Sequence, residues 1–178
     1  MNYNDLLEKA EQGDIEAQLN ISIAYMNGDV SGEPEIGKAL VWLEKAANSN
    51  HPIAQRLYAY SREKIFQDID GAFEWHQKAA NNNDPKSQAE LANYYYAGQV
   101  VEKNDTKALY WAKKAYMNGE ENMSPLLLGT LYIQGNVVSR NIYEAYKYIK
   151  ISAANGNELA LNFKSDMENQ IPQLKDYK

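Results

Sequence analysis

An internal repeat of about 35 residues constrains this fold more than any other feature. Four segments align on an aromatic residue, at Trp42, Trp75, Trp111 and Tyr148. Alanine stands three residues before each aromatic, and alanine or serine stands four residues after it. Self-similarity with a period of 20–50 residues indicates an array of stacked supersecondary units rather than one continuous core.

A second motif alternates with the first. It reads "AQLNISIAYMNG" at 17–28, "SQAELANYYYAG" at 87–98 and "SPLLLGTLYIQG" at 124–135, with a degraded copy, "AQRLYAYSREKI", at 54–65. A small residue is followed by an apolar residue four later, tyrosine eight later and glycine eleven later. Positions four apart share one face of a helix, and a terminal glycine suits the left-handed residue that ends it. Each repeat is therefore predicted to be a helical hairpin.

Helix boundaries follow from the two motifs and from prolines near the helix starts. Helices are predicted at 3–12, 14–27, 36–49, 52–64, 69–82, 85–97, 105–118, 123–134, 141–155 and 158–169. Residues 1–170 are expected to form a single repeat domain, with hairpins at about 14–50, 51–83, 84–119 and 120–156 and flanking helices at 3–12 and 158–169. Pro172 is expected to end the last helix and leave 171–178 as a frayed C-terminal tail.

The segment 87–119 resembles a Sel1-like repeat. The family features fall on Ser87, Leu91-Ala92, Tyr95, Gly98, Val101, Lys107-Ala108, Trp111, Lys114-Ala115-Tyr116 and Gly119. The family is an α/α solenoid related to tetratricopeptide repeats. The resemblance therefore implies an all-α, right-handed α/α solenoid of about four helical hairpins with a flanking half-hairpin at each end. The second repeat departs from the pattern, because it lacks about three loop residues after Ile65 and has Arg62 in place of its tyrosine. Its hairpin is expected to be tighter.

Composition narrows the classes of partner and compartment. A net charge of −6 argues against nucleic acid, which needs a basic face, and favours a basic protein partner, although solubility alone also explains it. The chain has no cysteine, which fits a reducing compartment. We see no signal peptide, and the apolar run Leu126–Ile133 is too short to span a membrane. A cytoplasmic location with no membrane partner is therefore expected.

Nothing in the sequence predicts catalysis. The two histidines, His51 and His76, share no metal-ligand spacing and are interpreted as solvated surface groups. Asp68 and Asp70 lie near a helix start, where carboxylates cap the helix or favour its dipole. No phosphate loop, nucleophile motif or paired catalytic carboxylates are visible. We expect a non-enzyme with no cofactor and no bound metal.

The repeated aromatic residues are assigned to the core: Trp42, Trp75, Trp111, Tyr25, Tyr95 and Tyr132. In related tetratricopeptide solenoids the first helix of each hairpin lines the concave surface. By that resemblance, the partner-binding concave face would be lined by Ile23, Met26, Arg56, Tyr60, Glu63, Asn93, Tyr96, Thr130 and Ile133. Several of these are residue types enriched at interfaces. The alternative is that hairpin packing partly buries this row.

These observations favour a module that binds another protein or a peptide through the concave face. Sel1-like proteins commonly act as adaptors, and some small bacterial members resemble immunity proteins that block a toxin by direct binding. A third possibility is structural self-assembly through apolar end residues: Leu6, Leu7, Ile15, Leu159, Leu161, Phe163 and Ile171. We expect a monomer and keep the homodimer as the alternative.

Overall fold

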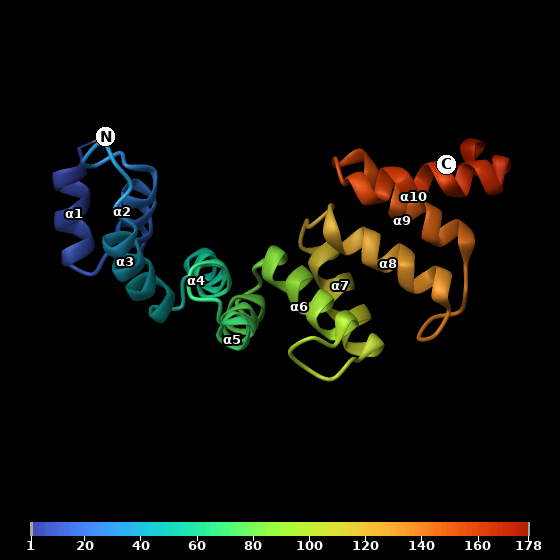
Figure 1. Cartoon of the computed structure of the whole chain (residues 1–178), viewed down its shortest axis with the longest axis horizontal. Helices are drawn as coiled ribbons and strands as arrows, with labels where there is room; N and C mark the ends of the chain where they lie inside the picture. The colour runs from blue at the N-terminus through green and yellow to red at the C-terminus, as the bar shows by residue number, and fades with distance from the viewer. Residues whose placement is uncertain (1, 178) are drawn as a thin grey trace. The chain divides into compact units, whose positions relative to one another are not determined.

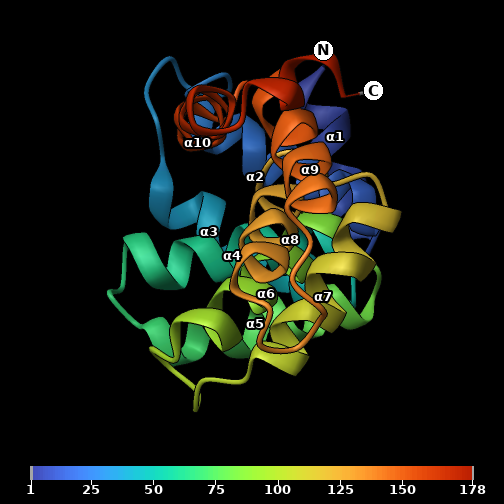
Figure 2. The ribbon, with the colours of Figure 1, turned by 90° about the vertical axis from the view of Figure 1, so that its right-hand side faces the viewer.

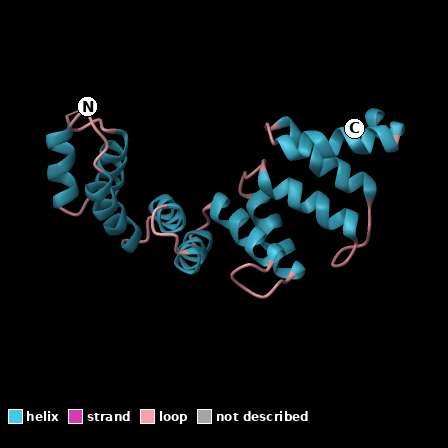
Figure 3. Cartoon of the chain, in the orientation of Figure 1, coloured by secondary structure: helices cyan, strands magenta, loops and turns pink. Residues whose placement is uncertain are grey.

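The computed structural model describes residues 2–177 and, within them, contains helices and no strands (Figures 1 and 3). The α-helices are α1 (Tyr3–Glu11), α2 (Ile15–Asn27), α3 (Ile36–Asn48), α4 (Pro52–Lys64), α5 (Ile69–Asn81), α6 (Pro85–Ala97), α7 (Asp105–Met117), α8 (Met123–Gln134), α9 (Ile142–Ala154) and α10 (Glu158–Gln170). A short 3₁₀ helix, η1 (Pro172–Asp176), follows them. Every α-helix boundary lies within one residue of its predicted position.

The chain divides into two compact units, Met1–Asp84 and Pro85–Lys178. The N-terminal unit contains α1–α5, and the C-terminal unit contains α6–α10 and η1. Two features stay predictions: that residues 1–170 form a single domain, and that the superhelix is right-handed.

In the N-terminal unit each helix packs against the next one along the chain. The interior combines fully buried alanines with larger residues such as Ile21 and Leu43. Alanine at the contact points lets neighbouring helices approach closely, and the larger side chains fill the spaces between them. Asp14 and Asp68 each cap a helix by accepting a backbone N–H, from Ala17 and Gly71 respectively, both at 2.8 Å.

In the C-terminal unit α6 pairs with α7 and α8 with α9, and Figures 1 and 2 both show α9 alongside α8. Leu128, Leu131 and Ile149 are fully buried there. Gly135 ends α8 with a φ of 72°, the left-handed conformation predicted for that glycine. The expected frayed tail is wrong, because residues 172–176 form η1 and bury Leu174 completely.

The repeated tryptophans are half-buried rather than core residues, which corrects the prediction. Trp42, Trp75 and Trp111 each pack one side of the indole against the core. A lysine three residues later lies over each ring, with Nζ 3.9, 3.6 and 5.1 Å from the respective centroids. The first three hairpins therefore each carry a cation–π pair at their edge, whereas the fourth has Tyr148 with Ile151 three residues later. Of the tyrosines assigned to the core, Tyr25 and Tyr95 are buried, and Tyr132 is half-buried and stacked on Tyr148.

The second hairpin is tighter than the others, as predicted. Only four residues separate α4 from α5, whereas seven or eight separate the helices of the other hairpins. Arg62 forms an ion pair with Asp68 across this turn. The Gly71 N–H and the Arg62 guanidinium both stabilise the carboxylate, and the pKa of Asp68 is lowered. Gln67 takes a φ of 55°, a left-handed conformation that glycine adopts more easily.

Candidate functional site

Both histidines are structural, and neither is the solvated surface group that was predicted. His76 is fully buried, and the ring of Tyr60 meets it edge-on with centroids 5.0 Å apart. Burial lowers the pKa of His76 to about 4, and the nearby carboxylates of Glu63 and Asp84 offset only part of this effect. His51 accepts the Ala54 N–H at the start of α4, and its Nε2 lies 2.9 Å from a Glu16 carboxylate oxygen.

In the N-terminal unit, three of the predicted face residues are engaged within the chain. Arg56 Nε donates to Asp84 at 3.1 Å, and both side chains are largely buried. Tyr60 covers His76, and Glu63 pairs with Lys64 at 2.5 Å.

The two apolar face residues of this unit, Ile23 and Met26, differ in exposure. Met26 is half-buried and packs against two buried clusters of the unit. Ile23 is therefore the apolar member that remains exposed at the surface, with 36 % of its area accessible.

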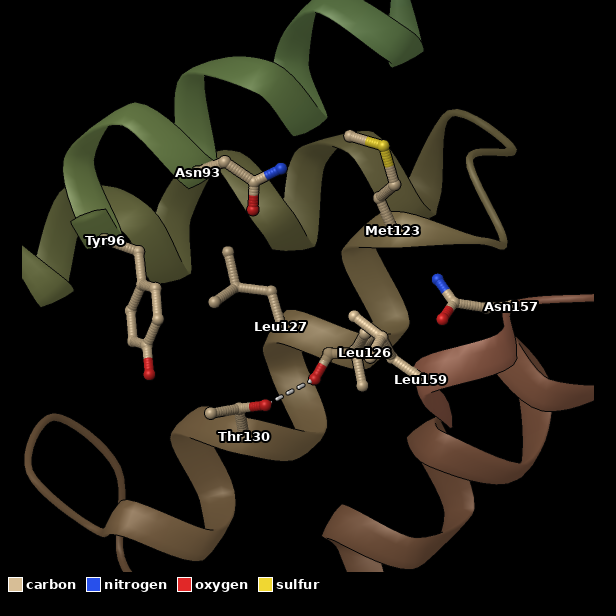
Figure 4. Close-up of a pocket in the computed structure, with 8 residues that line it drawn as sticks. All are labelled: Asn93, Tyr96, Met123, Leu126, Leu127, Thr130, Asn157 and Leu159. Carbon is tan, nitrogen blue, oxygen red and sulfur yellow. Dashed lines mark hydrogen bonds between the residues drawn. The ribbon is translucent and has the colours of Figure 1, made fainter. Parts of the chain in front are cut away.

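In the C-terminal unit a pocket brings three predicted residues together (Figure 4). It has a volume of about 290 Å³ and is formed by α6, α8 and the start of α10. Its lining consists of Asn93, Tyr96, Met123, Leu126, Leu127, Thr130, Asn157 and Leu159. These helices open successive hairpins, so the pocket lies on the first-helix surface that was assigned to partner binding.

Most polar groups around this pocket are already hydrogen-bonded. The Tyr96 hydroxyl accepts from Gln134 Nε2 at 2.7 Å, and Thr130 Oγ1 donates to the Leu126 carbonyl at 2.9 Å. Asn157 caps α10 by accepting the Ala160 N–H at 3.1 Å.

The Asn93 amide differs from these groups, since it points over the pocket in Figure 4 and makes no hydrogen bond within residues 2–177. The pocket therefore combines an apolar floor with one available amide at its rim.

Ile133, the remaining predicted residue, lies in a second pocket of about 310 Å³ on the same unit. That pocket is lined by Ile133, Arg140, Ile142, Phe163, Asp166, Met167, Gln170 and Ile171. Sequence reasoning missed five residues of the first pocket: Met123, Leu126, Leu127, Asn157 and Leu159. The helical spacing of Leu126 from Thr130 and Ile133 is the signal that indicates Leu126. Leu159 was assigned to self-assembly instead.

Within residues 2–177 no three metal-ligating side chains gather closely enough to hold an ion. In the same part of the chain, every helix is too short or too polar to cross a bilayer.

Paired helices with alanine contacts, repeated about every 35 residues, define an α/α repeat protein of the solenoid class. Among such proteins, this chain belongs to the Sel1 repeat family, whose profile matches residues 15–51, 52–84, 85–120 and 126–157. The Sel1 repeat is a protein-interaction module, and the family is generally a non-catalytic scaffold. This membership confirms the resemblance and the fold class read from the sequence.

Solved structures agree with this assignment. The chain is similar to a Sel1 repeat protein from Oxalobacter formigenes, with a TM-score of 0.74 and 26 % identity over 86 % of this chain and 63 % of that one. It is also similar to c5321, a protective antigen of uropathogenic Escherichia coli with an SLR fold, with a TM-score of 0.68 and 23 % identity over 94 % of this chain and 44 % of that one. The chain thus spans less than two thirds of both relatives.

A third similar structure is cysteine rich protein B of Helicobacter pylori, with a TM-score of 0.52 and 25 % identity over 76 % of this chain and 98 % of that one. This chain contains no cysteine, so the two sequences differ in the residue for which that protein is named. No curated protein matches the sequence.

Proposed function

We propose that this protein is a non-catalytic interaction module that binds a protein or peptide partner through the first-helix surface of its C-terminal unit. The observation that supports this most is the pocket, which is lined by Asn93, Tyr96 and Thr130 together with the exposed side chain of Leu159. Ile133 in the second pocket extends the same surface along α8. The lack of cysteine fits a reducing compartment, and we place this binding in the cytoplasm.

The size and lining of the pocket suit an amino-acid side chain. Small-molecule sites usually enclose about 300–1,000 Å³, and this pocket, at about 290 Å³, lies just below that range. Burying one leucine-sized or phenylalanine-sized side chain contributes about 1.5–3 kcal/mol. The Asn93 amide carries both a donor and an acceptor, so it can pair with the backbone of the segment that brings this side chain.

The experiment is an affinity capture from the native lysate with matched leucine variants of α10. Leu159 is 64 % exposed and lines the pocket, whereas Leu161 is 49 % exposed and does not. Because both are exposed, Leu159→Asn and Leu161→Asn should both leave the fold intact. We expect a stoichiometric partner with wild type and Leu161→Asn that is lost with Leu159→Asn.

Equal retention by all three proteins would contradict the pocket as the anchor site. The identity of a captured partner also separates two roles. A component of a cellular complex would indicate an adaptor, and a toxin would indicate an immunity protein.

A further inference from the structure

The turn between α4 and α5 exposes three large apolar side chains. Ile65, Phe66 and Ile69 are 50, 51 and 50 % exposed and lie within five residues of one another. In longer hairpin loops the apolar side chains turn inward, as when Val30 and Val137 pack against the core of their units. The shortened turn has no such valine. Its apolar residues instead form an exposed group, which we call the turn patch.

Some of the acidic side chains beside the turn patch are not paired with a basic side chain. Arg62 is paired with Asp68 and Lys64 with Glu63. Asp70 and Glu74 follow the patch on α5, are exposed, and make no ion pair within residues 2–177.

Acidic side chains also outnumber basic ones in the N-terminal unit as a whole. Residues 1–84 contain 14 acidic and seven basic side chains, whereas residues 85–178 contain 10 acidic and 11 basic ones. The negative field of the protein therefore originates in the unit that carries the turn patch.

We propose that the turn patch is a second docking surface, which receives a basic amphipathic helix of a partner protein. An exposed apolar group with free carboxylates beside it is complementary to apolar side chains flanked by lysine or arginine. A helix supplies that pattern, since residues at i, i+4 and i+7 form a stripe with cations on both sides. Three half-exposed side chains cover only the centre of an interface of about 800 Å² per partner, where the strongest contacts gather.

The test uses a phage-displayed library of random peptides of about 18 residues, or five helical turns. It is panned on the 178-residue chain, and the affinities of enriched peptides are then measured with four variants. Phe66→Ser/Ile69→Ser removes most of the turn patch. Val41→Ser/Ile53→Ser is the matched control, because those side chains are 54 and 42 % exposed in the same unit but lie outside the patch.

The remaining two variants test whether the acidic side chains contribute to peptide binding and whether the peptides bind at the turn patch or at the pocket. Asp70→Asn/Glu74→Gln removes the two free carboxylates, and Leu159→Asn alters the pocket of the C-terminal unit.

We expect enriched peptides with apolar residues at helical spacing and an excess of lysine and arginine. They should bind Phe66→Ser/Ile69→Ser about tenfold more weakly than wild type and bind the control within about twofold. Asp70→Asn/Glu74→Gln should weaken binding about threefold at low salt, with no difference left at about 1 M salt.

Each other outcome overturns the proposal. Failure to enrich any peptide, enrichment of acidic peptides, or equal binding to wild type and Phe66→Ser/Ile69→Ser would show that the turn patch is not a docking surface. Peptides that lose affinity only for Leu159→Asn would also overturn it, while supporting the function proposed for the pocket.

Discussion

The side-chain amide of Asn82 donates a 2.9 Å hydrogen bond to the side-chain carbonyl of Gln55. Gln55 is buried at the start of α4 and donates in turn to the Ala47 carbonyl at the end of α3. One glutamine therefore links three consecutive helices, since Asn82 caps the end of α5. Asn118 makes the same bond with Gln88 at 2.8 Å.

The first repeat has the glutamine of this arrangement but not the asparagine. Gln18 Nε2 donates to the Ala10 carbonyl at 3.2 Å, but its Oε1 is buried and accepts no hydrogen bond within residues 2–177. Position 49, which corresponds to Asn82 and Asn118, holds a serine that donates to the Lys45 carbonyl instead. Ser49→Asn should supply the missing donor and raise the free energy of unfolding by about 1 kcal/mol in urea denaturation.

The control for this prediction is Ser49→Ala, which removes the same serine bond without adding a donor. It should change stability by less than about 0.5 kcal/mol, because Ser49 is exposed. If Ser49→Asn is no more stable than Ser49→Ala, the amide of residue 49 does not reach Gln18.

The packing of α8 on α9 depends on one glycine. A Cβ at Gly129 would lie 2.6 Å from Ile149 Cγ1 and 3.0 Å from the Ala145 carbonyl oxygen. At the equivalent place in the third repeat, Ala92 stands in the first helix and Ala112 in the second. The glycine thus accommodates the larger Ile149. Gly129→Ala should destabilise the protein by about 2 kcal/mol through overpacking, as measured by urea denaturation.

A double-mutant cycle tests the stated cause. Ile149→Ala alone leaves a cavity and should cost about 2–5 kcal/mol. In Gly129→Ala/Ile149→Ala the new methyl group occupies part of that space, so the combined loss should be at least about 1 kcal/mol smaller than the two single losses together. Additive losses would show that the contact with Ile149 is not what makes glycine necessary.

Trp111 is one of the half-buried tryptophans. Trp111 packs one face against the core of its unit beneath Lys114, whereas the neighbouring Tyr110 is 58 % exposed. Trp111→Ala should lower the free energy of unfolding by about 3 kcal/mol, the lower end of the range for aromatic deletions in a core. Tyr110→Ala should lower it by less than about 1 kcal/mol. Similar losses for the two variants would contradict the packing role of Trp111.

The repeat period predicted the helices well because the same local sequence pattern recurs in every repeat. An alanine face, an aromatic residue and a glycine or asparagine at the end mark each hairpin independently. The burial of His76 was missed because the side chain was judged by its type. Comparison of the repeats indicates the burial, since Leu43, Ala112 and Ile149 occupy the equivalent position and are buried too. The segment η1 lies outside the repeats, so Leu174 has no equivalent position in another repeat from which its burial could be predicted.

The candidate site could be predicted only in part. Three residues of the predicted first-helix surface, Asn93, Tyr96 and Thr130, line one pocket, and all three follow the helical period. Arg56 and Glu63 pass the same test, but they pair within the chain. The partner of Arg56, Asp84, comes from another segment, and a helical pattern contains no information about it. The partner of Glu63 is its sequence neighbour Lys64.

The buried His76 predicts a loss of stability in mild acid. The unfolded chain binds a proton at this residue near pH 6.5, whereas the folded protein binds it only near pH 4. Between these values the unfolded state holds more protons, so the free energy of unfolding falls as pH decreases. From pH 6.5 to pH 5 we expect a contribution of about 1.5 kcal/mol from this residue. Urea denaturation at both pH values measures it.

Carboxylates of the protein also begin to titrate in this range, so the histidine contribution requires a reference protein. His76→Leu is suitable, because the first repeat has Leu43 at the equivalent buried position. The variant should lose about 1.5 kcal/mol less than wild type between pH 6.5 and pH 5, while the two proteins should change in parallel from pH 7.5 to pH 8.5. Parallel curves down to pH 5 would mean that His76 takes up its proton without unfolding, and that the imidazole has access to water or to the carboxylates of Glu63 and Asp84.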